Sequence, residues 1–156
     1  MGDLMQRLLR AFGRGSLAGL ALLGATAAAL PAQPALSAMQ GAWLEQSLPC
    51  GDVFTSTGKD LAFKKPASMF APAFIISGNR ISTPFASCRI VGVKPAGARQ
   101  ALTLGCTTAI ATADVRALLS VAEDGTLFRY LNDNDTTGSR YQRCTPKDAS
   151  GNSTSR

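Results

Sequence analysis

The chain contains no histidine, and only 17% of its 156 residues are charged and 6% aromatic. Without an imidazole, neither a Ser–His nor a Cys–His nucleophile pair can form. A Ser–Lys pair would need a buried lysine, and nothing in the sequence marks one. Carboxylates such as Asp52 and Glu123 fall at predicted strand ends and turns, where solvation accounts for them. We therefore predict no catalytic residues and expect a protein that is not an enzyme.

Closely spaced metal ligands are also missing. The four cysteines form no CxxC pair, so a zinc site would need four widely dispersed thiolates. Asp133, Asp135, Thr137 and Gly138 match part of a calcium loop, but Cys144 stands where a bidentate glutamate is required and no helices flank the loop. We expect an acidic hairpin loop there, no metal and no cofactor.

The apolar run at residues 17–30 is shorter than the roughly 20 residues that span a bilayer. Arg7, Arg10 and Arg14 precede the run, and small residues follow it, which is the order of a secretory signal peptide. Ala35 and Ser37 suit a cut after Ser37, with a cut one residue later as the alternative. We predict that a signal peptide, residues 1–38, is removed, leaving a domain at 39–145 and a disordered tail at 146–156.

The charge that remains after processing is mild. The formal charge is +6, and loss of three Arg and one Asp from the leader leaves 13 basic and 9 acidic residues, or +4. The basic residues are scattered, with no block longer than Lys64–Lys65. We expect no nucleic-acid binding, no integral membrane segment after processing, a monomer, and a protein partner that is more acidic than basic.

The cysteines indicate both the cellular compartment of the protein and its disulfide bonds. Four cysteines in an exported chain predict two disulfides and a periplasmic or secreted protein. Residues 87–93 and 100–107 read as a hairpin joined through 94–98, and centring it on Gly97 places Cys88 opposite Cys106. Cys50 then pairs with Cys144.

The rest of the mature chain consists of short apolar or β-branched runs between turn residues. Residues 74–77 and 80–83 flank Gly78–Asn79, a two-residue type II′ or I′ turn. Residues 115–122 could be helical by propensity, but the Asp124–Gly125 turn to residues 127–131 favours a strand. Further strands are expected at 42–46, 53–56, 61–64 and 139–144. We predict an all-β, antiparallel up-and-down meander that closes into a small barrel of about eight strands, filled by Trp43, Phe54, Phe74 and aliphatic side chains.

The order Gly41-Ala42-Trp43, Cys50, the hairpin at 76–81, Cys88, Cys106 and Cys144 resembles small uncharacterised four-cysteine periplasmic proteins of proteobacteria. It is more loosely similar to lipocalin-like barrel inhibitors of bacterial metalloproteases or of lysozyme. The resemblance implies a barrel with Trp43 on its floor, although a large core residue explains Trp43 equally. It carries over no target-binding residues.

One predicted loop combines restraint, charge and apolar surface. Lys64 and Lys65 precede Met69 and Phe70, and prolines at 66 and 72 bracket the pair. We predict these four residues as a binding site, with capping of the barrel end as the structural alternative. The leading function is an exported binding module that engages another protein in the manner of an inhibitor. The alternatives are a carrier of small apolar ligands and a structural envelope protein without a specific soluble partner.

Overall fold

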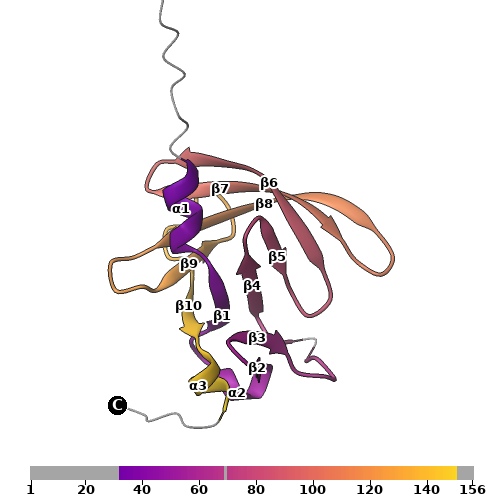
Figure 1. Cartoon of the computed structure of the whole chain (residues 1–156). Helices are drawn as coiled ribbons and strands as arrows, with labels where there is room; N and C mark the ends of the chain where they lie inside the picture. Colours follow the sequence, from indigo (N-terminus) through magenta and orange to yellow (C-terminus); the bar gives the residue numbers. More distant parts are fainter. Residues whose placement is uncertain (1–31, 69, 151–156) are drawn as a thin grey trace, which may run out of the picture.

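The computed structural model describes residues 32–150, apart from residue 69. Within these residues eight strands form a closed antiparallel barrel (Figure 1) in the order β1-β10-β9-β8-β7-β6-β5-β4. This confirms the predicted all-β barrel. Its strands are β1 (Gly41–Glu45), β4 (Ala73–Ser77), β5 (Arg80–Ser82), β6 (Ser87–Ala96), β7 (Arg99–Thr107), β8 (Thr112–Val121), β9 (Leu127–Tyr130) and β10 (Ser139–Cys144).

The barrel is a meander from β4 to β10, and β1 closes it by pairing with the two end strands. Ala42 lies opposite Cys144 of β10 and Ile75 of β4. The β4–β5 turn is the predicted two-residue turn: Ser77 pairs with Arg80, and Gly78 has φ +57°. No described non-glycine residue has positive φ, so the turn cannot be type I′, which leaves type II′. The strand preferred over a helix at 115–122 is confirmed as part of β8.

The β6–β7 hairpin has the predicted disulfide but not the predicted connection. Its strands continue through residues 94–96 to a two-residue turn, where Ala96 pairs with Arg99. This turn alone would place Cys88 opposite Thr107. A β-bulge between Ile90 and Gly92 shifts the register by one residue and brings Cys88 opposite Cys106. The bulge is therefore what makes the Cys88–Cys106 disulfide possible.

The barrel interior is packed around Trp43, which is fully buried. The indole Nε1–H donates a hydrogen bond to the carbonyl oxygen of Met39 at 2.8 Å, so its one polar group is satisfied. The Phe74 and Tyr141 rings lie 5.0 Å apart in the same core. Aliphatic side chains from most barrel strands complete it: Ile76, Ile81, Ile90, Leu102, Leu104, Leu119 and Leu127.

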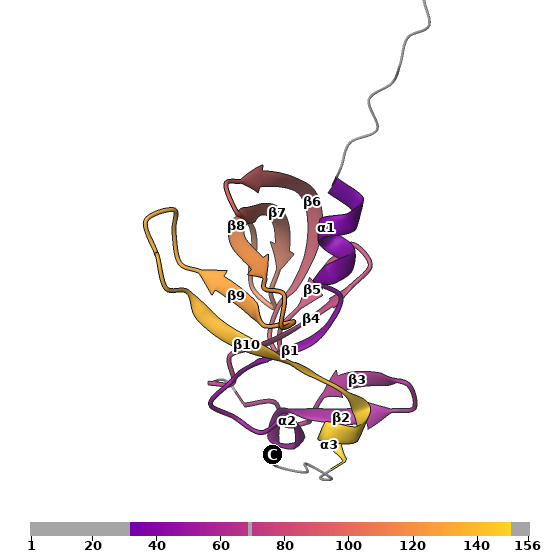
Figure 2. The same ribbon diagram turned by 90° about the vertical axis from the view of Figure 1, so that its left-hand side faces the viewer.

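A second core lies outside the barrel wall, where β2 (Phe54–Thr57) and β3 (Asp60–Phe63) form a separate hairpin. This hairpin and the short helices α2 (Cys50–Val53) and α3 (Pro146–Ala149) gather below β1 and β10 (Figure 2). Phe54 is fully buried there against Phe63. The prediction that Phe54 fills the barrel is therefore wrong, because the outward-facing Ala42 and Leu44 need an apolar cover of their own.

A short helix lies at each end of the described segment. Residues 1–31 of the predicted leader lie outside the described residues, and its last seven form α1 (Ala32–Ala38), with Leu36 packed on the barrel core. The predicted tail begins with α3, which a Thr145–Asp148 capping box starts. Residues 151–156 lie outside the described part. No helix among residues 32–150 is long and apolar enough to cross a bilayer.

The two disulfides are expected to differ in their contribution to stability. Cys50–Cys144 closes a loop with a sequence separation of 94, whereas Cys88–Cys106 closes one of 18. In the loop-entropy model these contribute somewhat under 5 and about 3 kcal/mol. Replacing Cys50 and Cys144 by serines should lower the free energy of unfolding more than replacing Cys88 and Cys106 does, as measured by urea denaturation. An equal or reversed order would show that local strain or packing, not loop length, sets the difference.

Candidate functional site at the open end of the barrel

A pocket of about 360 Å³ lies at one end of the barrel, which we call the mouth. Its lining comes from the start of β4, from the β5–β6 loop and from the barrel strands that meet there. Inward-facing apolar side chains line the pocket, and the Cys88–Cys106 disulfide lies among them. The apolar lining includes Phe74, Ile81, Leu104, Val115, Ala117 and Leu119.

The pocket lies beside the packed core of the barrel. Trp43 is fully buried in that core, and Met39 lies buried beside it. On β8, Val115 and Ala117 lie opposite Leu104 and Leu102, and both line the pocket. The core thus has a pocket at one side, which the filled barrel that we expected does not have.

Arg129 and Tyr141 add polar groups to the largely apolar pocket. Arg129 of β9 pairs with Leu119 and therefore occupies an inward position at the rim. Burial raises the pKa of the Tyr141 hydroxyl, and the neighbouring Arg129 guanidinium partly offsets this effect. Tyr141 thus stays a neutral hydroxyl beside a permanent cation. The mouth can accept an apolar group that carries an acceptor or a negative charge at its outer end.

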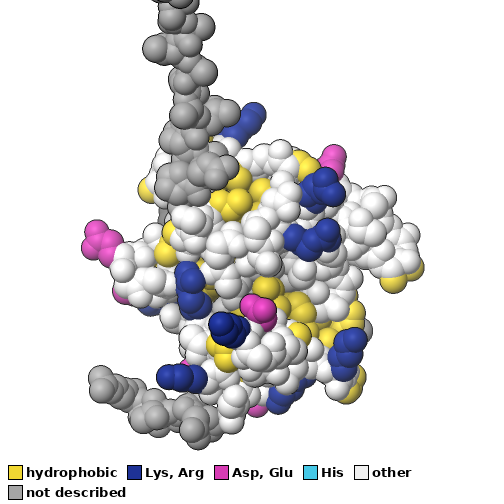
Figure 3. Space-filling model, viewed as in Figure 1, with side chains coloured by type: hydrophobic (Ala, Val, Ile, Leu, Met, Phe, Trp, Pro, Cys, Tyr) yellow, Lys and Arg dark blue, Asp and Glu magenta, His cyan; other side chains and the backbone are white. Residues whose placement is uncertain are grey.

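The rim of the mouth exposes apolar side chains to solvent. Phe85 in the β5–β6 loop is 55% exposed and Val115 is 43% exposed. Ile110 at the β7–β8 tip and Phe70 before β4 are 96% and 88% exposed. Figure 3 shows hydrophobic surface on this side of the molecule, where Figure 1 draws these loops. Phe85 and Val115 thus join an exposed apolar edge to the apolar pocket, and such a combination is typical of a binding surface.

The predicted binding loop borders the mouth. Its first residue, Lys64, is held by a backbone hydrogen bond to Val53, and its end, Ala71 and Pro72, lines the pocket. Lys64 and Lys65 are exposed. Phe70 does not cap the core, since it is 88% exposed, and Met69 lies outside the described residues.

Sequence analysis missed Phe85, Ile110 and Arg129. Phe85 follows Pro84 in a short connection between two strands, where an aromatic residue has no core to enter. That position is a usable signal. Ile110 carries the same signal at the tip of the next hairpin. No such signal marks Arg129 in the sequence, because its inward direction depends on the pairing of β9 with β8 and β10.

The carboxylates of the acidic β9–β10 loop stabilise its conformation. Asp133 forms an ion pair with Arg116 at 2.7 Å, and the Arg99 guanidinium donates hydrogen bonds to three backbone carbonyls of the loop. Asp135 accepts backbone hydrogen bonds from Leu131, Thr137 and Gly138. Within the described part of the chain, no group of three or more His, Cys, Asp or Glu residues could hold a metal ion.

Acid should loosen this loop through Asp135. The backbone N–H of Leu131 and, next, that of Gly138 lower the Asp135 pKa from 3.8 to about 2. Because the folded-state pKa is lowered, the carboxylate stabilises the fold above its unfolded pKa, and this stabilisation is lost as the pH falls through about 2.

The Asp135→Asn variant should therefore have a lower urea midpoint than wild type at pH 7. The gap should narrow between about pH 4 and pH 2 as the wild-type carboxylate becomes protonated. Amide NMR shifts of Leu131 and Gly138 in the folded protein should titrate with a midpoint near pH 2 in wild type only. A gap that stays constant down to pH 2 would show that the Asp135 charge does not stabilise the loop.

No protein-family model, no curated protein sequence and no solved structure matches this chain. A barrel by itself does not indicate a function, because one fold supports many. Only the chemistry of particular sites, above all the mouth, can indicate what this protein does.

Proposed function

We propose that the protein is an exported, non-enzymatic binding module that engages another protein through the mouth of its barrel. The observation that carries the proposal is an open apolar pocket whose rim exposes Phe85 and Val115. Two neighbouring loops add Phe70 and Ile110. An apolar side chain of the partner enters the pocket, and the exposed rim residues pack around it.

The exposed rim favours a protein over a small ligand. A ligand that fits within about 360 Å³ would fill the pocket but leave Phe70 and Ile110 in water. A protein surface covers both, and burying an apolar side chain of this size stabilises a complex by about 1.5–3 kcal/mol before the costs of association. The small-ligand carrier is the second candidate, supported by the volume of the pocket and by the Arg129 cation at its rim.

Export is part of the proposal. It is supported by the order of charged, apolar and small residues at the start of the sequence, and by two disulfides, which persist in oxidising compartments. A periplasmic or secreted location is consistent with both features. Inhibition of a secreted metalloprotease is the specific form that the resemblance to barrel inhibitors suggests.

The charges around the mouth favour an acidic partner. Among residues 32–150 without 69, the one ion pair is Arg116–Asp133. Lys64, Lys65 and Arg129 therefore have no carboxylate partner within that part of the chain. They can steer an acidic surface towards the mouth, whereas a basic protein such as a c-type lysozyme would be repelled.

The test compares a mouth variant with a matched control. Phe85→Ser with Ile110→Ser removes one exposed side chain from the rim and one from the β7–β8 tip. Leu131→Ser removes an 82% exposed side chain from the β9–β10 loop, on the other side of the barrel in Figure 1. Immobilised wild type and the Leu131 variant should capture the same acidic protein from an envelope extract. The double variant should bind it at least tenfold more weakly with an unchanged melting temperature.

Equal capture by both variants would refute the mouth as the interface. Native mass spectrometry of the purified protein tests the carrier in parallel. A small molecule that remains bound to wild type and is lost on Arg129→Gln would favour the carrier over the protein partner. Inhibition of lysozyme stronger than that of a metalloprotease would contradict the charge argument.

A further inference from the structure

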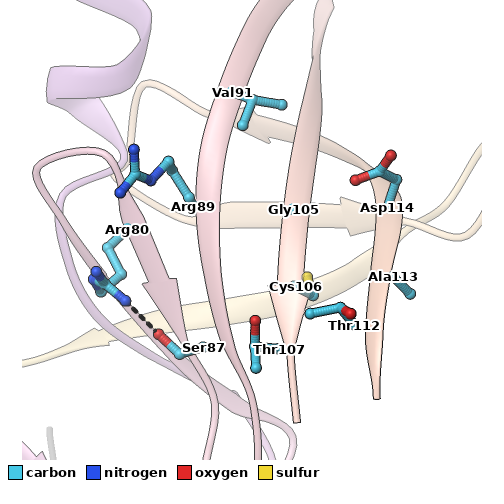
Figure 4. A pocket seen from close by; sticks show the side chains of 10 residues that line it. All are labelled: Arg80, Ser87, Arg89, Val91, Gly105, Cys106, Thr107, Thr112, Ala113 and Asp114. Carbon is cyan, nitrogen blue, oxygen red and sulfur yellow. Dashed lines mark hydrogen bonds between the residues drawn. The ribbon is translucent and has the colours of Figure 1, made fainter.

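A shallow hollow of about 630 Å³ lies on the outer face of β5 to β8, on the opposite side of the wall from the pocket in the mouth. Figure 4 shows its side chains. They come from two neighbouring rows that cross the strands. One row is Arg80, Arg89, Gly105 and Asp114, and the other includes Ser87, Thr107 and Thr112.

Two arginines stand directly opposite each other in this hollow. Arg80 pairs with Arg89, and both face outward because Ile81 and Cys88 between them are buried in the barrel. Like charges directly opposite on neighbouring strands are destabilising. Neither arginine has an ion-pair partner among residues 32–68 and 70–150. The pair therefore places two outward-facing cations side by side, where a bound anion would relieve their repulsion.

The groups beside the arginines can orient an oxyanion. Arg80 donates a hydrogen bond to the Ser87 hydroxyl at 2.7 Å, which fixes one guanidinium close to the outer hydroxyl row. Planar guanidinium groups bind phosphate by paired N–H donors, more strongly than they bind neutral acceptors. Figure 4 shows both guanidinium groups on one side of the hollow and the Asp114 carboxylate on the other.

Gly105 adds no side chain to the floor between Arg89 and Asp114, although the Asp114 Oδ1 and the Val91 Cγ1 lie 3.8 and 4.0 Å from the position that its Cβ would take. Gly105 pairs with both residues, so two strand spacings, roughly 10 Å, separate their backbones. Asp114 repels a bare anion at its end, but a carboxylate is a good acceptor for ligand hydroxyl groups. The hollow thus offers cations at one end, an acceptor at the other, and a flat floor between them.

We propose that this hollow binds a sugar phosphate, with Arg80 and Arg89 on the phosphate and Asp114, Thr107 and Thr112 facing the sugar hydroxyls. The juxtaposition of an unpaired arginine pair with a carboxylate across Gly105 carries the inference. It is independent of the mouth, which opens inside the barrel. The ligand is either a free sugar phosphate or a phosphate-and-polyol lipid headgroup.

The experiment titrates the purified protein with glucose 6-phosphate, inorganic phosphate and glucose, followed by NMR shifts of the amides at 105 and 107. Glucose 6-phosphate should bind at least threefold more tightly than phosphate, and glucose least. Arg89→Gln should weaken glucose 6-phosphate at least tenfold, whereas Lys59→Gln, a charge-matched change in the β2–β3 turn, should not.

Gly105→Val separates the two halves of the site. A Cβ at Gly105 would lie 3.8 Å from the Asp114 Oδ1, an ordinary contact, so the variant should fold. It should weaken glucose 6-phosphate while leaving phosphate within twofold. Vesicles of phosphatidylcholine with phosphatidylglycerol test the lipid source: cosedimentation that Arg89→Gln abolishes assigns the headgroup, and its absence beside soluble binding assigns the free ligand.

Three results would overturn the proposal. Glucose 6-phosphate and phosphate that bind equally would remove the role of Asp114. Equal effects of Arg89→Gln and Lys59→Gln would reduce the binding to net charge. Absence of any shift with millimolar probe and of any cosedimentation would remove the site.

Discussion

The structure depends on the pairing of β1 with both β10 and β4. This five-residue strand joins the two ends of the meander and turns an open sheet into a closed barrel. Without it, β4 and β10 would expose unpaired backbone groups. Its alternating side chains also serve two cores at once: Trp43 enters the barrel, whereas Ala42 and Leu44 pack outside it. The Cys50–Cys144 disulfide fastens the chain beside the same junction.

The barrel and both disulfides could be predicted from the sequence because short-range signals dominate them. Turn residues at Gly78 and Gly97 define hairpins, and hairpins in succession leave few topologies. The disulfide at Cys88 was nevertheless predicted from a hairpin centred on Gly97, whereas the structure combines a two-residue turn with a bulge at Val91. The predicted centre at Gly97 and the observed two-residue turn differ in register by one residue. The bulge shifts the register back by one residue, so both descriptions place Cys88 opposite Cys106.

The position of Phe54 was not predictable in the same way. An aromatic residue in a short strand indicates burial, and Phe54 is buried. Which of two cores it enters depends on whether β2 joins the barrel, and in the structure β2 pairs with β3 in a separate sheet. The candidate sites also differ in how far the sequence could reveal them. Composition marked the loop that contains Lys64 and Phe70, but Arg129 and the Arg80–Arg89 pair depend on register across several strands.

The second core makes the barrel wall unequal in thickness. At β1 and β10 the wall is packed on both faces, by Trp43 and Tyr141 inside and by Leu44 and Cys144 outside. Where β6 to β8 carry Arg89, Thr103 and Asp114, these outer side chains are in solvent. The mouth pocket and the outer hollow lie on the two faces of this part of the sheet, and Cys106 lines both. A substitution at Cys106 therefore changes the lining of two sites at once.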